Sequence, residues 1–261
     1  MRATVFALLL LSAVASPFAA DDIAVDVELV LAVDVSYSMD YDEQRLQREG
    51  YVAAFRHPDI KDAIASGRYK RIAVIYFEWA GIDRQVVRVP WTLIDGPEAS
   101  EKFAAALEAA PFKGGPRTSI SAAMTFAAEL FDENGFEGLR RVLDISGDGP
   151  NNMGKPVDGA RDALVGRGII INGLPLILRP AYMSGFSDTL ELNDYYRDCV
   201  IGGVGSFMVT VEKKEEFADA IRKKLIQELA EFPVRLIRVS RPSPAEPADC
   251  LIGEKLHQDV P

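Results

Sequence analysis

Segments with the pattern of buried strands and segments with the pattern of helices alternate along most of this 261-residue chain. The first strand is expected at Val25–Val33, where β-branched and other apolar residues dominate, as in a strand that is buried on both faces. Further strands are predicted at Arg71–Trp79, Gln85–Trp91, Arg141–Ile145, Ile169–Leu178 and Ser206–Val211. This alternation predicts one α/β domain with a doubly wound, mostly parallel sheet and helices on both faces.

Helices are predicted between these strands from apolar residues at helical spacing and from capping signals. The first begins after Asp40, where Glu43 completes a capping box, and ends near His57–Pro58. The others are expected at Glu98–Ala109, Ile120–Phe131 and Val157–Val165, with a final helix that carries Phe217, Ile221, Leu225 and Leu229 on one face. Because ligands of such sheets bind beyond the carboxyl ends of the strands, we expect function in the segments that follow the strands.

Oxygen-bearing side chains occur at three of these strand ends. Asp34, Ser36 and Ser38 alternate in the loop after the first strand, so that three oxygens can face one point. Thr118 opens the clearest predicted helix after a glycine-containing loop, and Asp148 follows a later strand between two glycines. Hard divalent cations such as Mg²⁺ prefer oxygen ligands of this kind. Taken singly, each residue also has an ordinary structural explanation, as a helix cap or a turn residue.

Taken together, these residues match a known pattern. Asp34-Val35-Ser36-Tyr37-Ser38-Met39, with Thr118 at the start of a later helix and Asp148-Gly149 after a following strand, resembles the metal-ion-dependent adhesion site (MIDAS) of von Willebrand factor A domains. The resemblance covers roughly Asp26–Ala230. More narrowly, the chain resembles a bacterial family of exported von Willebrand A proteins of unknown function, through Tyr76-Phe77-Glu78-Trp79, Val89-Pro90-Trp91-Thr92, Ser146-Gly147-Asp148-Gly149 and Cys199-Val200-Ile201-Gly202-Gly203.

The resemblance implies a ligand set and a function. Ser36, Ser38 and Thr118 would bind Mg²⁺ (or Mn²⁺) directly, while Asp34 and Asp148 would act largely through water. One coordination position would stay open for an Asp or Glu carboxylate of a protein partner. The chain is then expected to be a metal-dependent protein-binding domain, for adhesion or scaffolding, and not an enzyme.

A Mg²⁺-dependent nucleotide-binding or phosphoryl-hydrolysing enzyme is the alternative function. Gly149–Pro156 nearly matches a phosphate-binding loop, but Pro156 stands where a Ser or Thr hydroxyl would bind Mg²⁺. The two histidines, His57 and His257, are not expected near the proposed metal loops, so that no general base for Ser- or Cys-based catalysis is evident.

The first twenty residues differ in composition from the rest of the chain. Arg2 is their only charge, Val5–Val14 is apolar, and small residues end at Ala19–Ala20, as in a secretory signal peptide; an uncleaved membrane anchor is the alternative. We therefore expect residues 1–20 to direct export to the periplasm or the medium, residues 21–240 to form the domain, and residues 241–261 to form a Pro-rich tail. Without residues 1–20 the chain has 28 basic and 39 acidic side chains, a net charge of −11, which disfavours nucleic-acid and anionic-lipid partners.

Two further predictions concern the last third of the chain. Cys199 and Cys250 are the only cysteines, and export favours a disulfide between them that would tether the tail. Leu178–Val204 is long for a simple connection, follows a strand at the same edge as the metal loops, and is rich in aromatic residues. We hypothesise that Tyr182 and Phe186 contact the partner; the alternative is that the aromatic residues of this segment pack onto the domain.

Overall fold

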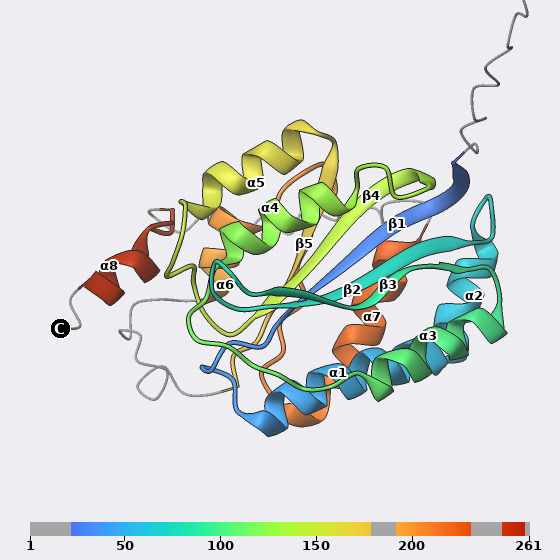
Figure 1. The fold of residues 1–261 in the computed structure, drawn as a ribbon, viewed down its shortest axis with the longest axis horizontal. Coiled ribbons are helices and arrows are strands. Elements are labelled where there is room, and N and C mark those ends of the chain that lie inside the picture. Colours follow the sequence, from blue (N-terminus) through green and yellow to red (C-terminus); the bar gives the residue numbers. More distant parts are fainter. Residues whose placement is uncertain (1–21, 179–191, 231–246, 259–261) are drawn as a thin grey trace, which may run out of the picture.

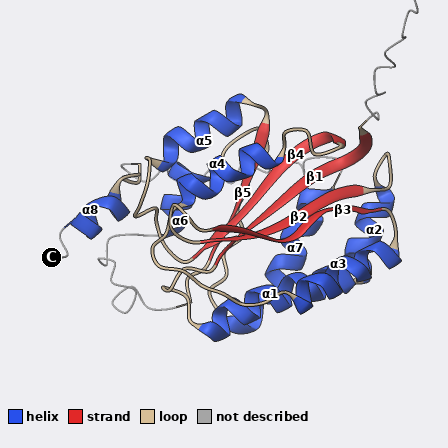
Figure 2. Cartoon of the chain, viewed as in Figure 1, coloured by secondary structure: helices blue, strands red, loops and turns tan. Residues whose placement is uncertain are grey.

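The computed structural model describes residues 22–178, 192–230 and 247–258, which form a sheet between two layers of helices (Figures 1 and 2). The five strands have the order β3-β2-β1-β4-β5; β3 is antiparallel to β2, and the other neighbours are parallel. Their bounds are β1 Ile23–Asp34, β2 Ile72–Trp79, β3 Gln85–Ile94, β4 Phe136–Gly147 and β5 Ile169–Pro175. The predicted doubly wound, mostly parallel α/β sheet is confirmed.

The helices form two groups on opposite faces of the sheet (Figure 1). One face is covered by α1 (Tyr41–Arg56), α2 (Pro58–Ser66), α3 (Pro97–Ala109) and α7 (Phe217–Leu229), which is preceded by the 3₁₀ turn η3 (Lys214–Glu216). The other face is covered by α4 (Ile120–Leu130), α5 (Val157–Gly166), α6 (Leu192–Tyr195) and the π-helical turn η2 (Tyr196–Val200). Within the described residues, no helix is long and apolar enough to cross a membrane.

The central strand β1 supplies side chains to both cores. Leu29 and Leu31 pack in the core beneath α1, α3 and α7, whereas Val30 and Ala32 pack in the core beneath α4 and α5. Successive side chains of a strand point to opposite faces, so a strand covered on both sides must be apolar at nearly every position. This explains the apolar run from which the strand was predicted.

The capping box at the start of α1 forms as predicted. Asp40 Oδ1 accepts a hydrogen bond from the Glu43 amide at 2.8 Å, and the Asp40 amide donates to Glu43 Oε2 at 2.9 Å. α1 ends at Arg56, as expected. Pro58, however, begins the second helix α2, which the sequence analysis did not predict. Proline suits the first turn of a helix because its missing N–H needs no partner there, so Pro58 both ends one helix and starts the next.

The predicted strand at Ser206–Val211 is wrong in detail. This segment lies along β5, but it forms only isolated bridges, at Met208 and Val211. The Gly173 amide donates to the Phe207 carbonyl at 3.0 Å, and the Val211 amide donates to the Pro175 carbonyl at 3.0 Å. Between these bonds, a regular parallel ladder would need an N–H at position 175, which proline lacks. Pro175 therefore interrupts the ladder.

Candidate functional site

The loops that follow β1 and β4 meet through the side chains that the sequence analysis selected. Asp34, the last residue of β1, is fully buried, and its Oδ1 accepts a hydrogen bond from the Ser36 amide at 2.7 Å. The hydroxyl oxygens of Ser36 and Ser38 lie 2.7 Å apart. The Ser38 hydroxyl donates to Asp148 Oδ1 at 2.6 Å. Four of the five predicted ligands are thus gathered at the carboxyl ends of two adjacent strands.

The fifth residue, Thr118, is brought to the same edge by backbone pairing. The loop that precedes it pairs with the β1 loop, because the Tyr37 amide donates to the Gly115 carbonyl at 2.9 Å and the Gly115 amide donates to the Val35 carbonyl at 3.1 Å. Thr118 itself is buried. The cap of α4 is Ser119, whose hydroxyl accepts from the Ala122 amide, so the ordinary structural role considered for Thr118 belongs to its neighbour.

Asn152 connects Thr118 to the loop after β4, and the sequence analysis missed it. The Thr118 amide donates to Asn152 Oδ1 at 2.9 Å, and the Asn152 amide donates to the Thr118 carbonyl at 2.9 Å. Asn151 is completely buried beside it, and its Oδ1 accepts from the Ser121 amide at 3.0 Å. The only sequence signal for these roles is a pair of asparagines in a strand-end loop. Their partners lie about thirty residues away in the chain.

The electrostatics of this cluster favour a cation. Burial, and then the negative charge of Asp148, raises the pKa of Asp34 well above its usual range. The Ser36 side chain and the Asp148 amide partly offset this rise in pKa, but the buried Oδ2 of Asp34 makes no hydrogen bond of regular geometry. A buried carboxylate without full hydrogen bonding is costly unless it gains a donor or a positive charge. Two carboxylates and three hydroxyls are oxygen donors that suit a hard divalent cation, so the residues present fit Mg²⁺ or Mn²⁺.

Hydroxyl ligands are essential to any such metal site. Within the described part of the chain, no group of three or more His, Cys, Asp or Glu side chains is arranged to hold a metal ion. A cation at the carboxyl edge of the sheet would therefore depend on Ser36, Ser38 and Thr118 as well as on the two aspartates.

Two buried polar side chains of α1 donate hydrogen bonds to carbonyl groups of the site loops. Gln44 Nε2 donates to the carbonyls of Ser36 and Met39 at 3.3 and 3.2 Å. Arg48 donates to the Ala110 carbonyl at 2.5 Å and forms an ion pair with the buried carboxylate of Glu78. The guanidinium of Arg48 also lies 3.5 Å from the centre of the Phe112 ring. One helix thus anchors both the loop after β1 and the loop that leads to Thr118.

The geometry of residues 149–156 differs from that of a phosphate-binding loop. Asn151 is fully buried, and its Nδ2 donates to the Lys155 carbonyl at 3.2 Å. The amides of Asn151 and Asn152 donate to the Tyr195 hydroxyl and to the Thr118 carbonyl, so neither is directed at a phosphate. His57 caps α2, at the far end of a sixteen-residue helix from the site, or about 24 Å away at 1.5 Å per residue.

The structure gives different outcomes for the aromatic residues after β5. Tyr195 and Tyr196 are completely buried, so for these two the packing explanation is correct. The Tyr196 hydroxyl donates to the Gly147 carbonyl at 3.4 Å, directly beneath the loop that carries Asp148. Tyr182 and Phe186 fall in residues 179–191, outside the described residues, and their role stays a prediction.

The predicted disulfide is present. Cys199 in η2 is bonded to Cys250, with Cα atoms 5.5 Å apart. Cys250 precedes the short helix α8 (Ile252–Gln258), which the sequence analysis did not predict.

A mostly parallel sheet of this order, with Asp, Ser and Thr loops converging at its carboxyl edge, has the fold of von Willebrand A domains. Residues 24–233 match the family described as "Protein of unknown function (DUF1194)", and the chain belongs to that family. Among curated proteins, none matches the chain.

Several solved structures share the fold at low sequence identity. Proximal thread matrix protein 1 from the mussel byssus, "with zinc occupied MIDAS motif", has a TM-score of 0.54 at 15% identity and matches 80% of this chain and 49% of its own. The pilus adhesin SpaC from Lactobacillus rhamnosus GG has a TM-score of 0.55 at 13% identity over 80% of this chain and 31% of its own. A von Willebrand factor type A protein from Catenulispora acidiphila scores 0.54 at 14% identity over 79% and 43%. The chain spans half or less of the length of these proteins.

Proposed function

We propose that this chain is a metal-dependent protein-binding domain. Asp34, Ser36, Ser38, Thr118 and Asp148 hold Mg²⁺ or Mn²⁺, and the ion captures an Asp or Glu carboxylate of a partner protein. The observation that carries this proposal is the convergence of the loops after β1 and β4 through the Ser36–Ser38–Asp148 contacts, around a buried Asp34 oxygen without a well-formed hydrogen bond.

The charge balance of the site supports capture of an acidic group. Of the five proposed ligands, two are carboxylates, Asp34 and Asp148, and the other three are neutral hydroxyls, so within the described residues the ligand set does not exceed the charge of a divalent ion. A further negative ligand is therefore attracted to the metal instead of being repelled. The structural neighbours include a pilus adhesin and a byssus matrix protein, which agrees with a role in holding other proteins.

The place of action and the partner contacts are part of the same proposal. Residues 1–20 direct the chain out of the cytoplasm, to the periplasm or the medium, where the Cys199–Cys250 disulfide is stable. Tyr182 and Phe186, which follow β5 in the chain, contact the partner beside the metal and select it.

The test is a thermal unfolding titration of the mature protein with Mg²⁺ alone. A ligand present at a hundredfold excess over its Kd stabilises the folded state by about 2.7 kcal/mol. The wild-type melting temperature should therefore rise with Mg²⁺, whereas that of Asp34→Ala should stay constant. Asp42→Ala is the matched control: Asp42 is an exposed carboxylate in the first turn of α1, and its variant should respond as the wild type does.

Equal Mg²⁺ responses in the wild type and in Asp34→Ala would remove these residues as the site. A response that requires ATP together with Mg²⁺ would replace the proposal with the nucleotide-binding alternative.

A further inference from the structure

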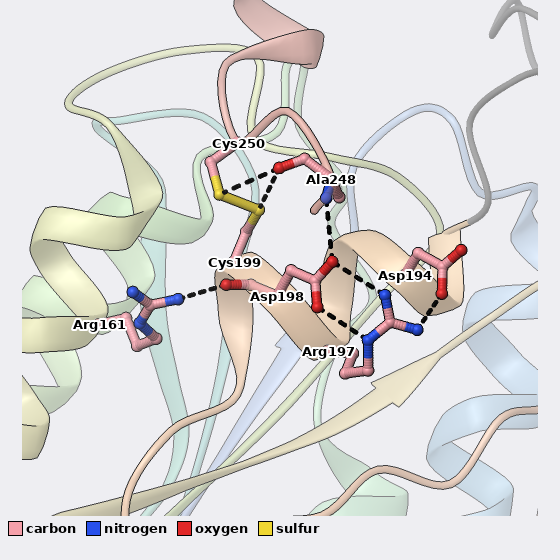
Figure 3. A network of polar contacts seen from close by, with 7 residues as sticks. All are labelled: Arg161, Asp194, Arg197, Asp198, Cys199, Ala248 and Cys250. Atoms are coloured by element: carbon pink, nitrogen blue, oxygen red, sulfur yellow. Dashed lines mark hydrogen bonds and ion pairs between the residues drawn. A yellow bond between two sulfur atoms is a disulfide. The ribbon is translucent and has the colours of Figure 1, made fainter. Parts of the chain in front are cut away.

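Residues near the end of the chain contact the loop that carries Asp148. Residues 247–258, named here the C-terminal strap, are joined to η2 by the Cys199–Cys250 disulfide. Figure 3 shows the polar network around this bond. The Ala248 amide donates to Asp198 Oδ2 at 2.9 Å, and Arg161 of α5 donates to the Asp198 carbonyl at 2.6 Å.

From this anchor, the strap reaches the loop after β4. Glu254 Oε1 in α8 accepts a hydrogen bond from Asn151 Nδ2 at 2.6 Å. Gly253 lies directly on the backbone of Asn151: a Cβ at position 253 would stand 2.1 Å from the Asn151 carbonyl oxygen, so only glycine fits there. The strap is therefore in close contact with one residue of the loop that carries Asp148.

Asn151 also bonds to the start of α4. The side chain of this fully buried residue makes three hydrogen bonds: Oδ1 accepts from the Ser121 amide, and Nδ2 donates to the Lys155 carbonyl and to Glu254. The Asn151 amide also donates to the Tyr195 hydroxyl at 3.1 Å. The next residue, Asn152, is bonded to Thr118 in both directions. A continuous set of contacts thus runs from the disulfide to Thr118, one of the proposed metal ligands, through the loop that also carries Asp148.

We propose that the C-terminal strap is a positioning element for the metal site: through Glu254 and Asn151, it holds the Thr118 and Asp148 loops in the arrangement that binds the ion. The inference rests on the proposed metal function. Neither Glu254 nor Asn151 is a ligand. Groups that orient metal ligands change affinity typically 10- to 100-fold when they are removed, so loss of the strap contact should weaken metal binding without abolishing it.

The experiment measures the Kd for Mn²⁺ by calorimetry, together with urea unfolding of the same samples. In Glu254→Ala, which leaves Asn151 Nδ2 without its carboxylate acceptor, the Kd should increase about tenfold. Glu254→Gln keeps a carbonyl oxygen that can accept the same hydrogen bond, and its Kd should stay near the wild-type value. Lys255→Ala, which changes an exposed residue of the same helix, is the control for the substitution itself.

A second readout does not depend on the metal. The amides of Thr118 and Ser121 donate to the Asn152 and Asn151 side chains, so their hydrogen exchange should become faster in Glu254→Ala than in Glu254→Gln. The double variant Cys199→Ser/Cys250→Ser should shift both the Kd and the exchange rates in the same direction as Glu254→Ala.

The outcomes separate the two proposals. A wild-type protein that binds no Mn²⁺ would overturn the metal site and this inference with it. Normal wild-type binding, with an unchanged Kd and unchanged exchange in Glu254→Ala, would overturn the role of the strap alone. A fall in the free energy of unfolding without any change in Kd would likewise show that the strap only stabilises the fold.

Discussion

Gly147, the last residue of β4, shows how closely the parts of the site approach one another. A Cβ at this position would lie 2.9 Å from Asp34 Oδ2 and 2.9 Å from the Tyr196 hydroxyl. The Tyr196 hydroxyl belongs to a completely buried side chain, and Asp34 is fixed by its hydrogen bond from Ser36. Neither group can move away easily, so glycine is needed here for space.

We expect Gly147→Ala to lower the free energy of unfolding by about 1–3 kcal/mol, the usual cost of an added carbon in a packed interior. Gly159 is the matched control. It lies in α5, and a Cβ there would meet nothing within 4 Å, so Gly159→Ala should leave the protein equally stable or make it up to about 1 kcal/mol more stable. Urea unfolding in the presence of EDTA measures both. Equal stability of Gly147→Ala and wild type would contradict the crowding argument.

On the scale of elements, α7 and β4 meet at a buried charged cluster. Lys224 and Glu228 of α7 face Asp144 in β4, and Lys224 Nζ forms ion pairs with Asp144 Oδ1 at 2.6 Å and with Glu228. Asn172 Nδ2 donates to Glu228 Oε1 at 3.0 Å. Burial, and then the negative charge of Asp144, raises the pKa of Glu228 to about 7.

This cluster predicts a dependence of stability on pH. Between pH 4.5, the ordinary pKa of a glutamate, and about pH 7, folded Glu228 keeps a proton that the unfolded chain has lost. The folded state then binds more protons, so stability falls as the pH rises through this range, by up to about 3 kcal/mol. Urea unfolding in EDTA at pH 5, 6, 7 and 8 should show the decline in the wild type and a flatter profile in Glu228→Gln.

The control for this profile is Glu137→Gln, an exposed glutamate on β4, which should keep the wild-type slope. If the profile of Glu228→Gln has the same slope as the wild type, Glu228 does not titrate in this range.

Most elements of the fold could be predicted because their signals are local. Val25–Val33 is apolar on both faces of its strand, and Asp40 with Glu43 forms a capping box within four residues. β4 was predicted too short because its first half, from Phe136 to Arg140, is partly exposed and lacks the apolar run of its buried half. The course of residues 206–211 depends on the missing N–H of Pro175 opposite them, which no local pattern shows.

In the candidate site, too, the local features could be predicted and the long-range contacts could not. Asp34, Ser36 and Ser38 share one loop, so the sequence alone indicates that their oxygens converge. The contributions of Asn152 and Asn151 depend on partners in another loop, and the contact with Glu254 depends on a residue 103 positions away. Such pairings are set by how the strands and helices pack, and therefore could not be predicted from spacing.

For the molecule as a whole, the disulfide is the one covalent cross-link, and it ties the end of the chain to the domain. Cys199 and Cys250 are 51 residues apart. A cross-link that closes a loop of that size lowers the entropy of the unfolded chain and thereby stabilises the folded state by about 4 kcal/mol. Denatured, unreduced protein should therefore contain no free thiol. Cys199→Ser/Cys250→Ser should unfold at a lower urea concentration. Two reactive thiols in unreduced protein isolated from outside the cytoplasm would contradict the bond.

Both edges of the sheet are unsuited to accept another strand. The edge strand β3 contains Pro90, which has no N–H to donate, and its pairing with β2 is irregular near the same point. At the other edge, residues 207–211 already bond to β5 at several positions. A partner therefore cannot easily join this protein by extending its sheet. Edge-to-edge pairing of two copies of the chain is disfavoured for the same reason.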